Sequence, residues 1–400
     1  MRAAPPETPC VRAEEAVLAP EFRRTTEEVL ARMGVSGRLY TVGLLLSAGL
    51  TALGAAAWGW QLWSGLGVTG LQHPVMWATY IASFIWWIGI AHSGTMVSAI
   101  LYLFRAPFRS AFSRAAEAMT LIAIVTAAMF PILHLGRAWR AYWLFPYPNE
   151  RDLWVTFRSP LILDVFAVLA YLIVSALFFW LGLIPDLAVL RDRAKGWART
   201  WYGLGSLGWE GRGAQWKQYL LAYSLLAGLA TPLVISVHSI VSWDFSLTLV
   251  PGWHSTLFPP YFVAGAVFSG LAMVLTLVLP MRAALRLERF ITERHLDQLA
   301  RLVLLMSLLV SFSYVLEYWT AWHSPEPMER IDLLEKATGA LAPLFWTSLV
   351  CNSLAPLALF WPGVRRSVPA LFLLSLVINV GMWLERFIVV AGSLMRDYLP

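Results

Sequence analysis

The sequence predicts an all-α, polytopic membrane protein, and three observations lead to this prediction. Apolar residues make up 58% of the 400 residues. Charged residues make up only 14%, whereas an ordinary soluble domain is about one quarter charged, so this chain lacks the polar surface that a soluble protein needs. The apolar residues also fall into separate stretches, each long enough to form a helix that crosses a bilayer, which takes about 20 residues.

These apolar stretches define the expected transmembrane helices. They are residues 39–63, 75–104, 115–135, 160–185, 218–241, 260–280, 301–322, 339–361 and 368–395. Residues 1–37 are polar, begin with several prolines and lack the basic-then-apolar order of a cleaved signal peptide. We expect them to form a cytoplasmic tail ahead of the first helix.

The distribution of Lys and Arg predicts the orientation of the helices. Cytoplasmic connections retain an excess of basic residues; one alternating set of connections holds 16 of them, whereas the other set holds six. The N-terminus is therefore expected inside. The connections expected outside are 64–74, 136–159, 242–259 and 323–338. They carry many aromatic residues, such as Trp139, Tyr147 and Trp154, which is typical of short segments at the headgroup level.

A weak internal repeat divides the helices into two groups. Gly89 and Gly94 in the second helix resemble Gly265 and Gly270 in the sixth, and small residues of this kind allow helices to pack closely in a membrane. The sequence Ser-Pro-Leu at 159–161 likewise resembles Ala-Pro-Leu at 342–344. We expect two tandem four-helix bundles, at residues 74–242 and 259–396, with the helix at 38–64 flanking them. An even number of helices in each unit makes the two repeats parallel.

The cysteines and the net charge exclude several classes of function. Cys10 and Cys351 lie far apart in different surroundings, which excludes a disulfide framework, a cysteine-ligated zinc site and a cysteine-held iron–sulfur cluster within the chain. The net charge of +6 comes almost wholly from Arg between apolar stretches. It therefore indicates membrane orientation rather than binding to nucleic acid.

Ionisable residues inside the expected helices are the candidates for function, because each costs several kcal/mol in a bilayer unless it is paired or reaches water. His134 falls at the outer end of the third helix and Asp164 at the outer start of the fourth. His238 and Asp244 fall at the outer end of the fifth helix. Three successive helices thus place histidine and carboxyl groups at one level, and Arg137 follows His134 closely.

This combination suits the oxidation of a quinol, which releases two protons as it loses two electrons. A histidine can accept a hydroxyl proton, and a neighbouring carboxylate fixes its tautomer. We therefore assign His134 as proton acceptor and Asp164 as its orienting carboxylate, with His238, Arg137 and Asp244 as further quinol-binding residues. In the plainer alternative, His134 and Asp164 only cap their helices, where the helix dipoles favour them.

A second set of ionisable residues suggests a path for protons. His92 lies in the middle of the second helix and Glu117 near the inner end of the third, so together they are candidates for carrying protons from the inner face. The candidates in the second bundle are Glu317, Glu385 and Arg386. In the alternative interpretation, His92 bonds a nearby backbone or hydroxyl group and Glu117 pairs with Arg114.

Several long segments resemble a known family of membrane subunits. The sequences WIGIAHSGT at 87–95, RAAEAMT at 114–120 and FPILHLGR at 130–137 resemble the NrfD/PsrC family, the membrane subunits of polysulfide reductases. The sequences TPLVISVHSIVS at 231–242 and GMWLERF at 381–387 look most like the ActC subunit of bacterial alternative complex III, a quinol:electron-acceptor oxidoreductase. The resemblance covers about residues 40–400.

The resemblance implies an enzyme subunit and its partners. It implies oxidation of menaquinol or ubiquinol near the periplasmic face of the bacterial inner membrane, with His134 and Asp164 near the quinone and no haem or iron–sulfur cluster bound by this chain itself. Electrons would pass to a periplasmic iron–sulfur subunit (ActB-like). Further implied partners are a homologous NrfD-like membrane subunit (ActF-like), multihaem and monohaem cytochromes c (ActA-like and ActE-like) and a terminal oxidase. Coupled proton translocation is a further expectation. Family members usually continue after the Leu399-Pro400 region into a tenth helix, so we expect either a short form or a trimmed sequence here.

Four alternatives stay open on the sequence alone. The chain could be the quinone-reducing membrane anchor of a molybdopterin oxidoreductase, which works in the opposite direction. A secondary transporter would also have parallel repeats, although it predicts broken helices around a central site. In a purely structural anchor, the polar groups would only neutralise one another. In a haem protein, His134 and His238 would serve as ligands.

Overall fold

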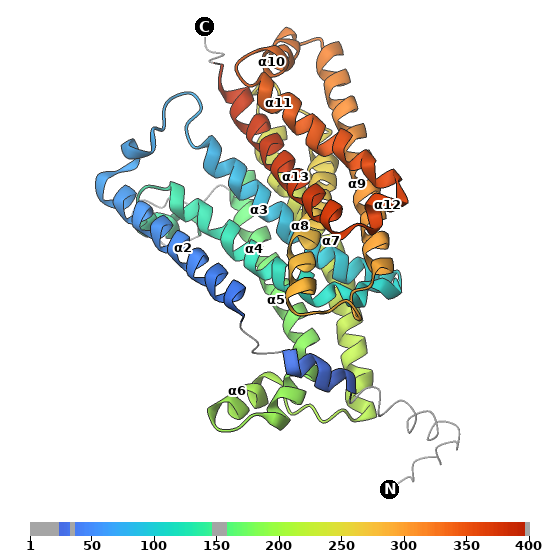
Figure 1. Ribbon diagram of the computed structural model, residues 1–400. Helices are drawn as coiled ribbons and strands as arrows, with labels where there is room; N and C mark the ends of the chain where they lie inside the picture. The colour runs from blue at the N-terminus through green and yellow to red at the C-terminus, as the bar shows by residue number, and fades with distance from the viewer. Residues whose placement is uncertain (1–23, 33–36, 146–157, 397–400) are drawn as a thin grey trace. The chain divides into compact units, whose positions relative to one another are not determined.

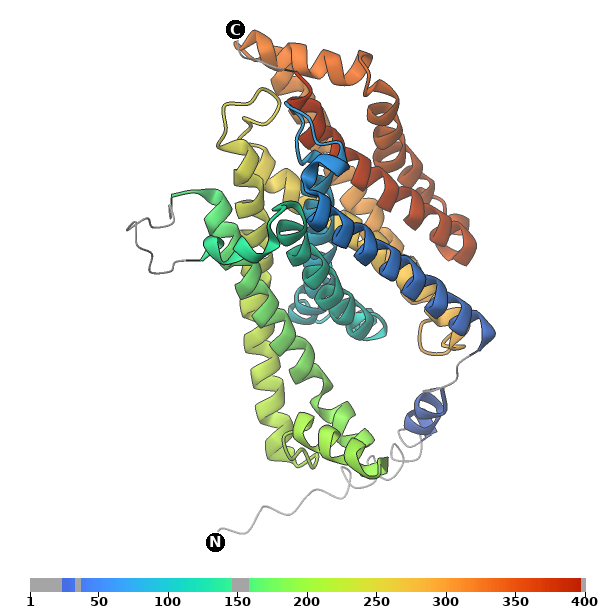
Figure 2. The ribbon, with the colours of Figure 1, turned by 90° about the vertical axis from the view of Figure 1, so that its left-hand side faces the viewer.

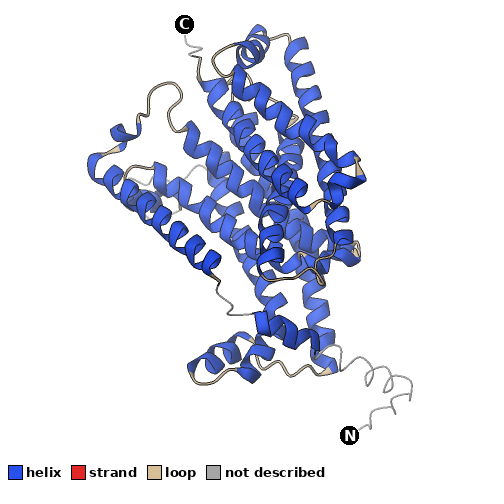
Figure 3. Cartoon of the chain, in the orientation of Figure 1, coloured by secondary structure: helices blue, strands red, loops and turns tan. Residues whose placement is uncertain are grey.

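The chain folds almost entirely into helices. The structure is a computed structural model that describes residues 24–32, 37–145 and 158–396. Within these residues no strand occurs, and nine helices are long and apolar enough to cross a membrane (Figure 3). The predicted class, an all-α polytopic membrane protein, is therefore confirmed. Most of the expected N-terminal tail and the aromatic residues Tyr147 and Trp154 lie outside the described residues.

Four helices form the first bundle. They are α3 (Ala78–Leu103), α4 (Ser113–His134), α5 (Pro160–Arg193) and α7 (Gly213–Ser246). Helix α3 packs against α4 and α7, and α5 packs against the same two helices (Figure 1). Short 3₁₀ turns and the helix α6 (Trp197–Gly205) join them. We call the end of the bundles at which α4 ends and α5 begins the outer end, following the predicted orientation.

The second bundle has the same plan. Its parts are α8 (Phe258–Ala284), α9 (Glu293–His323), an eighth span made of α11 (Ala342–Leu349), η4 (Val350–Leu354) and η5 (Ala355–Phe360), and α13 (Val368–Phe387) with its π-helical extension η6 (Ile388–Gly392). Helix α8 packs against α9 and α13, and α13 against the eighth span. The short helices α10 (Pro327–Thr338) and α12 (Pro362–Arg366) connect these spans.

Helices α3 and α8 lie at the centre and join the two bundles. Small residues make this possible, because a Cβ atom on Gly270 would meet the Ser93 side chain of α3. A Cβ atom on Gly94 would similarly meet the Ala116 carbonyl oxygen of α4. The expected close packing of these small residues is therefore present, and it brings the polar residues of the two bundles within reach of each other.

Helices α5 and α7 are longer than the sequence predicted. Each has 34 residues and so spans about 51 Å, well beyond the apolar stretches 160–185 and 218–241. Helix α5 continues to Arg193 because Leu and Arg are good helix formers, and Gly196 with a positive φ follows three residues after its end. The two helices run side by side, with α6 packed at their inner end (Figure 2).

The eighth span departs from regular α-helix in its middle. Pro356 has no N–H to donate to the carbonyl of Asn352, four residues earlier. The helix there changes to π and then 3₁₀ geometry. The Ser307 hydroxyl of α9 donates to the Asn352 carbonyl instead, at 2.9 Å. A neighbouring helix thus satisfies the backbone group that proline leaves free, as a bilayer interior requires.

The first membrane span forms a separate unit. Helix α2 (Arg38–Ser64) belongs to a unit separate from the helices that follow. It is apolar along its whole length, and its most apolar window has no buried residue. A helix with such a surface has side chains that contact lipid or another protein.

The close approach of α3 and α4 generates a stability prediction. We expect Gly94→Ala to lower the free energy of unfolding by about 1–3 kcal/mol, because the added methyl group overpacks against backbone. The matched control is Gly228→Ala in α7, where a Cβ atom meets nothing within 4 Å and the better helix propensity of Ala leaves stability equal or higher. Thermal unfolding of both variants in the same detergent tests this, and equal melting temperatures would contradict the packing described.

Candidate functional site

The outer end of the first bundle brings two carboxyl groups together. Asp164 lies in the first turns of α5 after Pro160 and is 7% exposed. Its carboxyl group lies within hydrogen-bonding reach of Asp244 near the end of α7. A hydrogen bond between two carboxyl groups requires a shared proton. Oδ1 of each group is buried and receives no hydrogen bond from a donor among the described residues.

His134 lies at the same end of the bundle as the last residue of α4. Its Nδ1 is 2.9 Å from the Phe130 carbonyl oxygen, so Nδ1 carries the hydrogen and Nε2 is the proton-accepting nitrogen in the neutral ring. The rings of Trp77 and Tyr80 lie beside the imidazole, with centroids 6.1 and 6.5 Å away. The backbone, rather than Asp164, thus orients this histidine, because no hydrogen bond joins the two side chains in the described structure.

Arg137 follows directly after the end of α4. Gly136 adopts a positive φ of 70° there, a conformation that favours glycine and turns the chain away from the helix axis. The Arg137 side chain is exposed. It therefore places a positive charge near the surface at this end of the bundle, and its predicted role in binding quinol stays a prediction.

His238 does not lie in the outer group. It is fully buried against His92, with ring centroids 4.9 Å apart and an edge-to-face arrangement. Tyr171 stacks on His92 at 4.6 Å and donates its hydroxyl hydrogen to the Ala91 carbonyl or Thr95 Oγ1. None of the four ring nitrogens of the two histidines bonds a described side chain, and the backbone of Ile88 lies beside His92 and that of Phe262 beside His238. This central histidine pair is therefore buried without a side-chain hydrogen bond.

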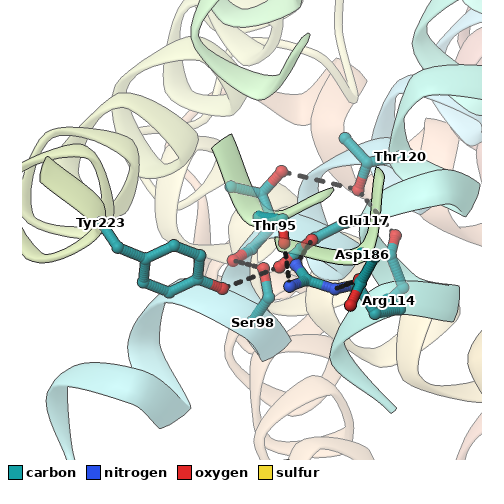
Figure 4. Close-up of polar contacts among 9 residues, drawn as sticks. Thr95, Ser98, Arg114, Glu117, Thr120, Asp186 and Tyr223 are labelled. Atoms are coloured by element: carbon teal, nitrogen blue, oxygen red, sulfur yellow. Dashed lines mark hydrogen bonds and ion pairs between the residues drawn. The ribbon is translucent and has the colours of Figure 1, made fainter. Parts of the chain in front are cut away.

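The inner end of the first bundle holds Glu117 in a network of polar contacts. Its carboxylate accepts from Arg114 Nη1 at 3.0 Å and from the Tyr223 hydroxyl at 2.9 Å. Arg114 also bonds the Gly182 carbonyl and lies 3.6 Å from Asp186 (Figure 4). The pairing of Glu117 with Arg114 that the sequence offered as an alternative is therefore present, and it neutralises the charge in the membrane interior.

Hydroxyl groups continue from this network toward the central histidine pair. Thr95 lies 3.5 Å from Thr120 and 3.3 Å from Ser175, oxygen to oxygen. Ser98 contacts Glu117 on one side (Figure 4). On the other side the Tyr171 hydroxyl donates to Thr95 Oγ1 at 2.9 Å. A proton can be passed along such a series only if its members reorient in turn, and every member here except Glu117 is a neutral hydroxyl group.

Polar residues of the second bundle lie on the other side of the central histidine pair. Arg386 donates to Glu385 Oε1 at 3.1 Å, and Tyr261 donates to the same oxygen. The Arg386 guanidinium lies 4.4 Å above the Phe262 ring, whose other neighbour is His238 at 6.0 Å between centroids. The third candidate of this bundle, Glu317, is separate and accepts from Ser255 Oγ at 2.9 Å.

Above these residues, α10 carries ionisable groups outside the membrane-spanning segments. Asp332 pairs with Lys336 at 2.6 Å, and Lys336 also donates to Ser393 at 2.8 Å. Glu329 accepts from the Gly252 backbone N–H at 2.9 Å. Burial raises the pKa of Asp332 and of Glu329, while Lys336 acts in the opposite direction on both. These contacts fasten α10 to the chain ahead of α8 and to η6.

The sequence analysis did not identify Tyr171, Tyr223 or Asp186 as candidate functional residues. Tyrosine in an apolar stretch resembles any other lipid-facing aromatic residue, and only its neighbours in space show that its hydroxyl is used. Tyr314 does carry a signal, because it lies three residues before Glu317 and so shares its face of the helix. Within the part of the chain that the structure describes, no group of three or more His, Cys, Asp or Glu residues could hold a metal ion.

Two curated relatives match a large part of the chain. A protein of Halobacterium salinarum, provisionally named as a membrane subunit of dimethyl sulfoxide reductase, is 27% identical over 288 residues, which are 72% of this chain and 60% of that protein. The Hdr-like menaquinol oxidoreductase integral membrane subunit of Archaeoglobus fulgidus is 24% identical over 240 residues, 59% of this chain and 49% of that protein. The chain therefore spans between half and three fifths of the length of these relatives.

The comparison with family models covers most of the chain. The model described as polysulphide reductase, NrfD matches residues 67–396. This range contains both bundles and every candidate residue named above. The chain is a multi-pass integral membrane protein that belongs to the NrfD polysulphide reductase family.

Proposed function

We propose that this chain is the quinol-oxidising membrane subunit of a multi-subunit oxidoreductase. The observation that carries the proposal is the carboxyl pair Asp164–Asp244 at the same end of the first bundle as His134, whose Nε2 is the accepting nitrogen. A quinol at this end would lose one hydroxyl proton to Nε2 and the other to the carboxyl pair, while its two electrons leave to a partner subunit. The name of the Archaeoglobus relative, a menaquinol oxidoreductase subunit, supports a quinol as substrate.

The electron acceptor belongs to the partners. In the proposed complex an ActB-like iron–sulfur subunit lies above the outer end in the periplasm and passes electrons on to haem-bearing ActA-like and ActE-like subunits. The segments 231–242 and 381–387 favour alternative complex III as the assembly, in the inner membrane and with the N-terminus in the cytoplasm. In this proposal the buried polar groups of this chain take up protons, and the electrons leave through the partner subunits.

We further propose that the interior polar residues form a proton path. It begins at Glu117 and continues through Thr95 and Tyr171 to the central histidine pair. From there Arg386 and Glu385 extend it into the second bundle, toward Glu317. The burial of both imidazoles without a side-chain hydrogen bond supports this role, because buried polar groups are normally satisfied and exceptions call for a functional explanation.

A second candidate function follows from the Halobacterium relative, which is named as a membrane subunit of a dimethyl sulfoxide reductase. In this case the same outer site would exchange electrons with a molybdopterin enzyme through an iron–sulfur subunit. The subunits that co-purify with the chain decide between the two functions. Multihaem cytochromes support alternative complex III, and a molybdenum-containing subunit without haem supports the second candidate.

The outer site is tested by removing the accepting imidazole. We expect His134→Ala to lower quinol oxidation by the purified complex by about 100-fold, the effect typical of losing a general base. His323→Ala is the matched control, because His323 also ends a helix at the outer end and bonds the carbonyl four residues earlier through Nδ1 at 2.9 Å. Quinol oxidation at the wild-type rate in His134→Ala would contradict the assignment.

The proton path is tested at its inner end. We expect Glu117→Gln to largely abolish quinol-driven proton uptake into the path, measured with a pH dye inside proteoliposomes, while quinol oxidation in detergent continues. Asp192→Asn, an exposed carboxylate at the inner end of α5, serves as control and keeps uptake unchanged. Equal uptake in Glu117→Gln and in the control would remove Glu117 from the path.

A further inference from the structure

Helix α6, at the inner end of the first bundle, presents an exposed apolar face (Figure 1). Trp197, Trp201 and Leu204 are 78%, 66% and 64% exposed. Their spacing of four and then three residues places them in one stripe along the helix. Arg199 falls on the opposite side of the same helix. The helix is therefore amphipathic, and no part of the described chain covers its apolar stripe.

A contact with α5 shows the depth at which α6 lies. Gly196, with a φ of 60°, turns the chain after the end of α5. The indole N–H of Trp180 in α5 donates to the Gly205 carbonyl at 3.0 Å, so the end of α6 lies beside Trp180. Trp180 is about 30 Å along α5 from its first residue, Pro160. This distance equals the thickness of the hydrocarbon core of a bilayer, so α6 lies where α5 leaves the core at the inner end.

Further aromatic residues gather at this level. Trp209, which follows α6, packs edge-on against Trp216 and Tyr219 of α7, with ring centroids 5.0 and 5.5 Å away. The Trp216 side chain is also exposed. Together with the tryptophans of α5 and α6, these residues form an aromatic cluster, and tryptophan and tyrosine are enriched where a membrane meets water.

The exposed apolar surface of the two long helices extends to the level of α6. On α7, Leu229, Leu225 and Leu221 are exposed at helical spacing. On α5, Val189 is exposed only four residues before the helix ends. Exposed apolar side chains on a membrane-spanning helix contact lipid. The lipid-facing surface of the bundle therefore reaches α6 on both of the helices that precede and follow it.

The same segment carries an excess of positive charge. Residues 191–217 contain two acidic residues, Asp192 and Glu210, and six basic residues, Arg191, Arg193, Lys195, Arg199, Arg212 and Lys217. Each carboxylate is paired with a nearby arginine, at 2.8 Å in the case of Asp192. Arg193, Lys195 and Lys217 are exposed and form no ion pair with a described residue. The free charge around α6 is therefore positive and complements an anionic surface.

We propose that α6 is an amphipathic anchor that lies in the inner leaflet of the membrane and binds anionic phospholipid headgroups. Trp197, Trp201 and Leu204 enter the boundary between headgroups and acyl chains, while Arg193 and Lys195 bind lipid phosphates. A bilayer fits this face better than a soluble partner does, because α6 lies at the edge of the core beside helices that contact lipid. The anchor fixes the inner ends of α5 and α7, and the inference does not depend on the proposed function.

Spin labels on the intact complex in lipid nanodiscs test the depth of α6. In a background with Cys10→Ser and Cys351→Ser, a nitroxide is attached at Leu204→Cys on the apolar stripe or at Arg199→Cys on the opposite side. Collisions with oxygen, which concentrates in lipid, are compared with collisions with a water-soluble nickel complex. We expect the label at residue 204 to be protected from nickel and accessible to oxygen. The matched label at residue 199 is expected to be accessible to nickel.

Photoactivatable lipids test the binding of anionic headgroups. Phosphatidylglycerol and phosphatidylcholine probes are added in equal small amounts, and their cross-links to residues 191–217 are measured by mass spectrometry. We expect Lys195→Gln to lower cross-linking of phosphatidylglycerol about fivefold, the effect of one basic residue near an anionic surface. Cross-linking of phosphatidylcholine is expected to stay unchanged. Arg330→Gln, at an exposed position on α10 at the other end of the bundles, is the control and is expected to change neither.

The outcomes distinguish lipid from water and from a protein partner. Equal access of nickel to the labels at residues 204 and 199 places α6 in water and overturns the proposal. A label at residue 204 that is shielded from both nickel and oxygen shows that protein covers the stripe, and it also overturns the proposal. Equal cross-linking of phosphatidylglycerol in Lys195→Gln and Arg330→Gln overturns the binding of anionic headgroups. None of these results bears on quinol oxidation at the outer end.

Discussion

The low polarity of a bilayer interior is the constraint on which the rest of this structure depends, because a polar group there must find a partner within the protein. Glu117 has Arg114 and Tyr223, and Glu385 has Arg386 and Tyr261. The carboxyl groups of Asp164 and Asp244 have each other. Some buried polar atoms have no hydrogen-bonding partner among the described side chains. Most of them belong to the carboxyl pair, the central histidine pair and Glu385.

The packing of the two bundles turns these separate groups into a connected system. Gly94 and Gly270 let α3 approach α4 and α8 more closely than larger residues would allow. His92 on α3 therefore meets His238 on α7, and His238 lies across Phe262 from Arg386 on α13. The proposed proton path from the inner end of one bundle to the outer end of the other therefore depends on a few glycine contacts.

Much of the fold could be predicted from the apolar stretches. The depth of a given residue within the membrane could not always be predicted from them. His238 was expected at the outer end because the apolar stretch ends near residue 241. Helix α7 continues to Ser246, so His238 lies about 12 Å from the helix end and meets His92 instead. Asp244 stays at the outer end and pairs with Asp164, as their common level predicted. Tyr171, Tyr223 and Asp186 could not be predicted, since their roles arise from contacts between helices distant in sequence.

The central claim is that the Asp164–Asp244 pair takes up a proton when quinol is oxidised at the outer end of the first bundle. Redox-difference infrared spectroscopy of the complex, with aspartate labelled by carbon-13, measures this most directly. The account predicts a change in a protonated carboxyl band that shifts with the label and disappears in both Asp164→Asn and Asp244→Asn. A carboxyl band that is unchanged by quinol oxidation, in a complex that turns over at the wild-type rate, would contradict it.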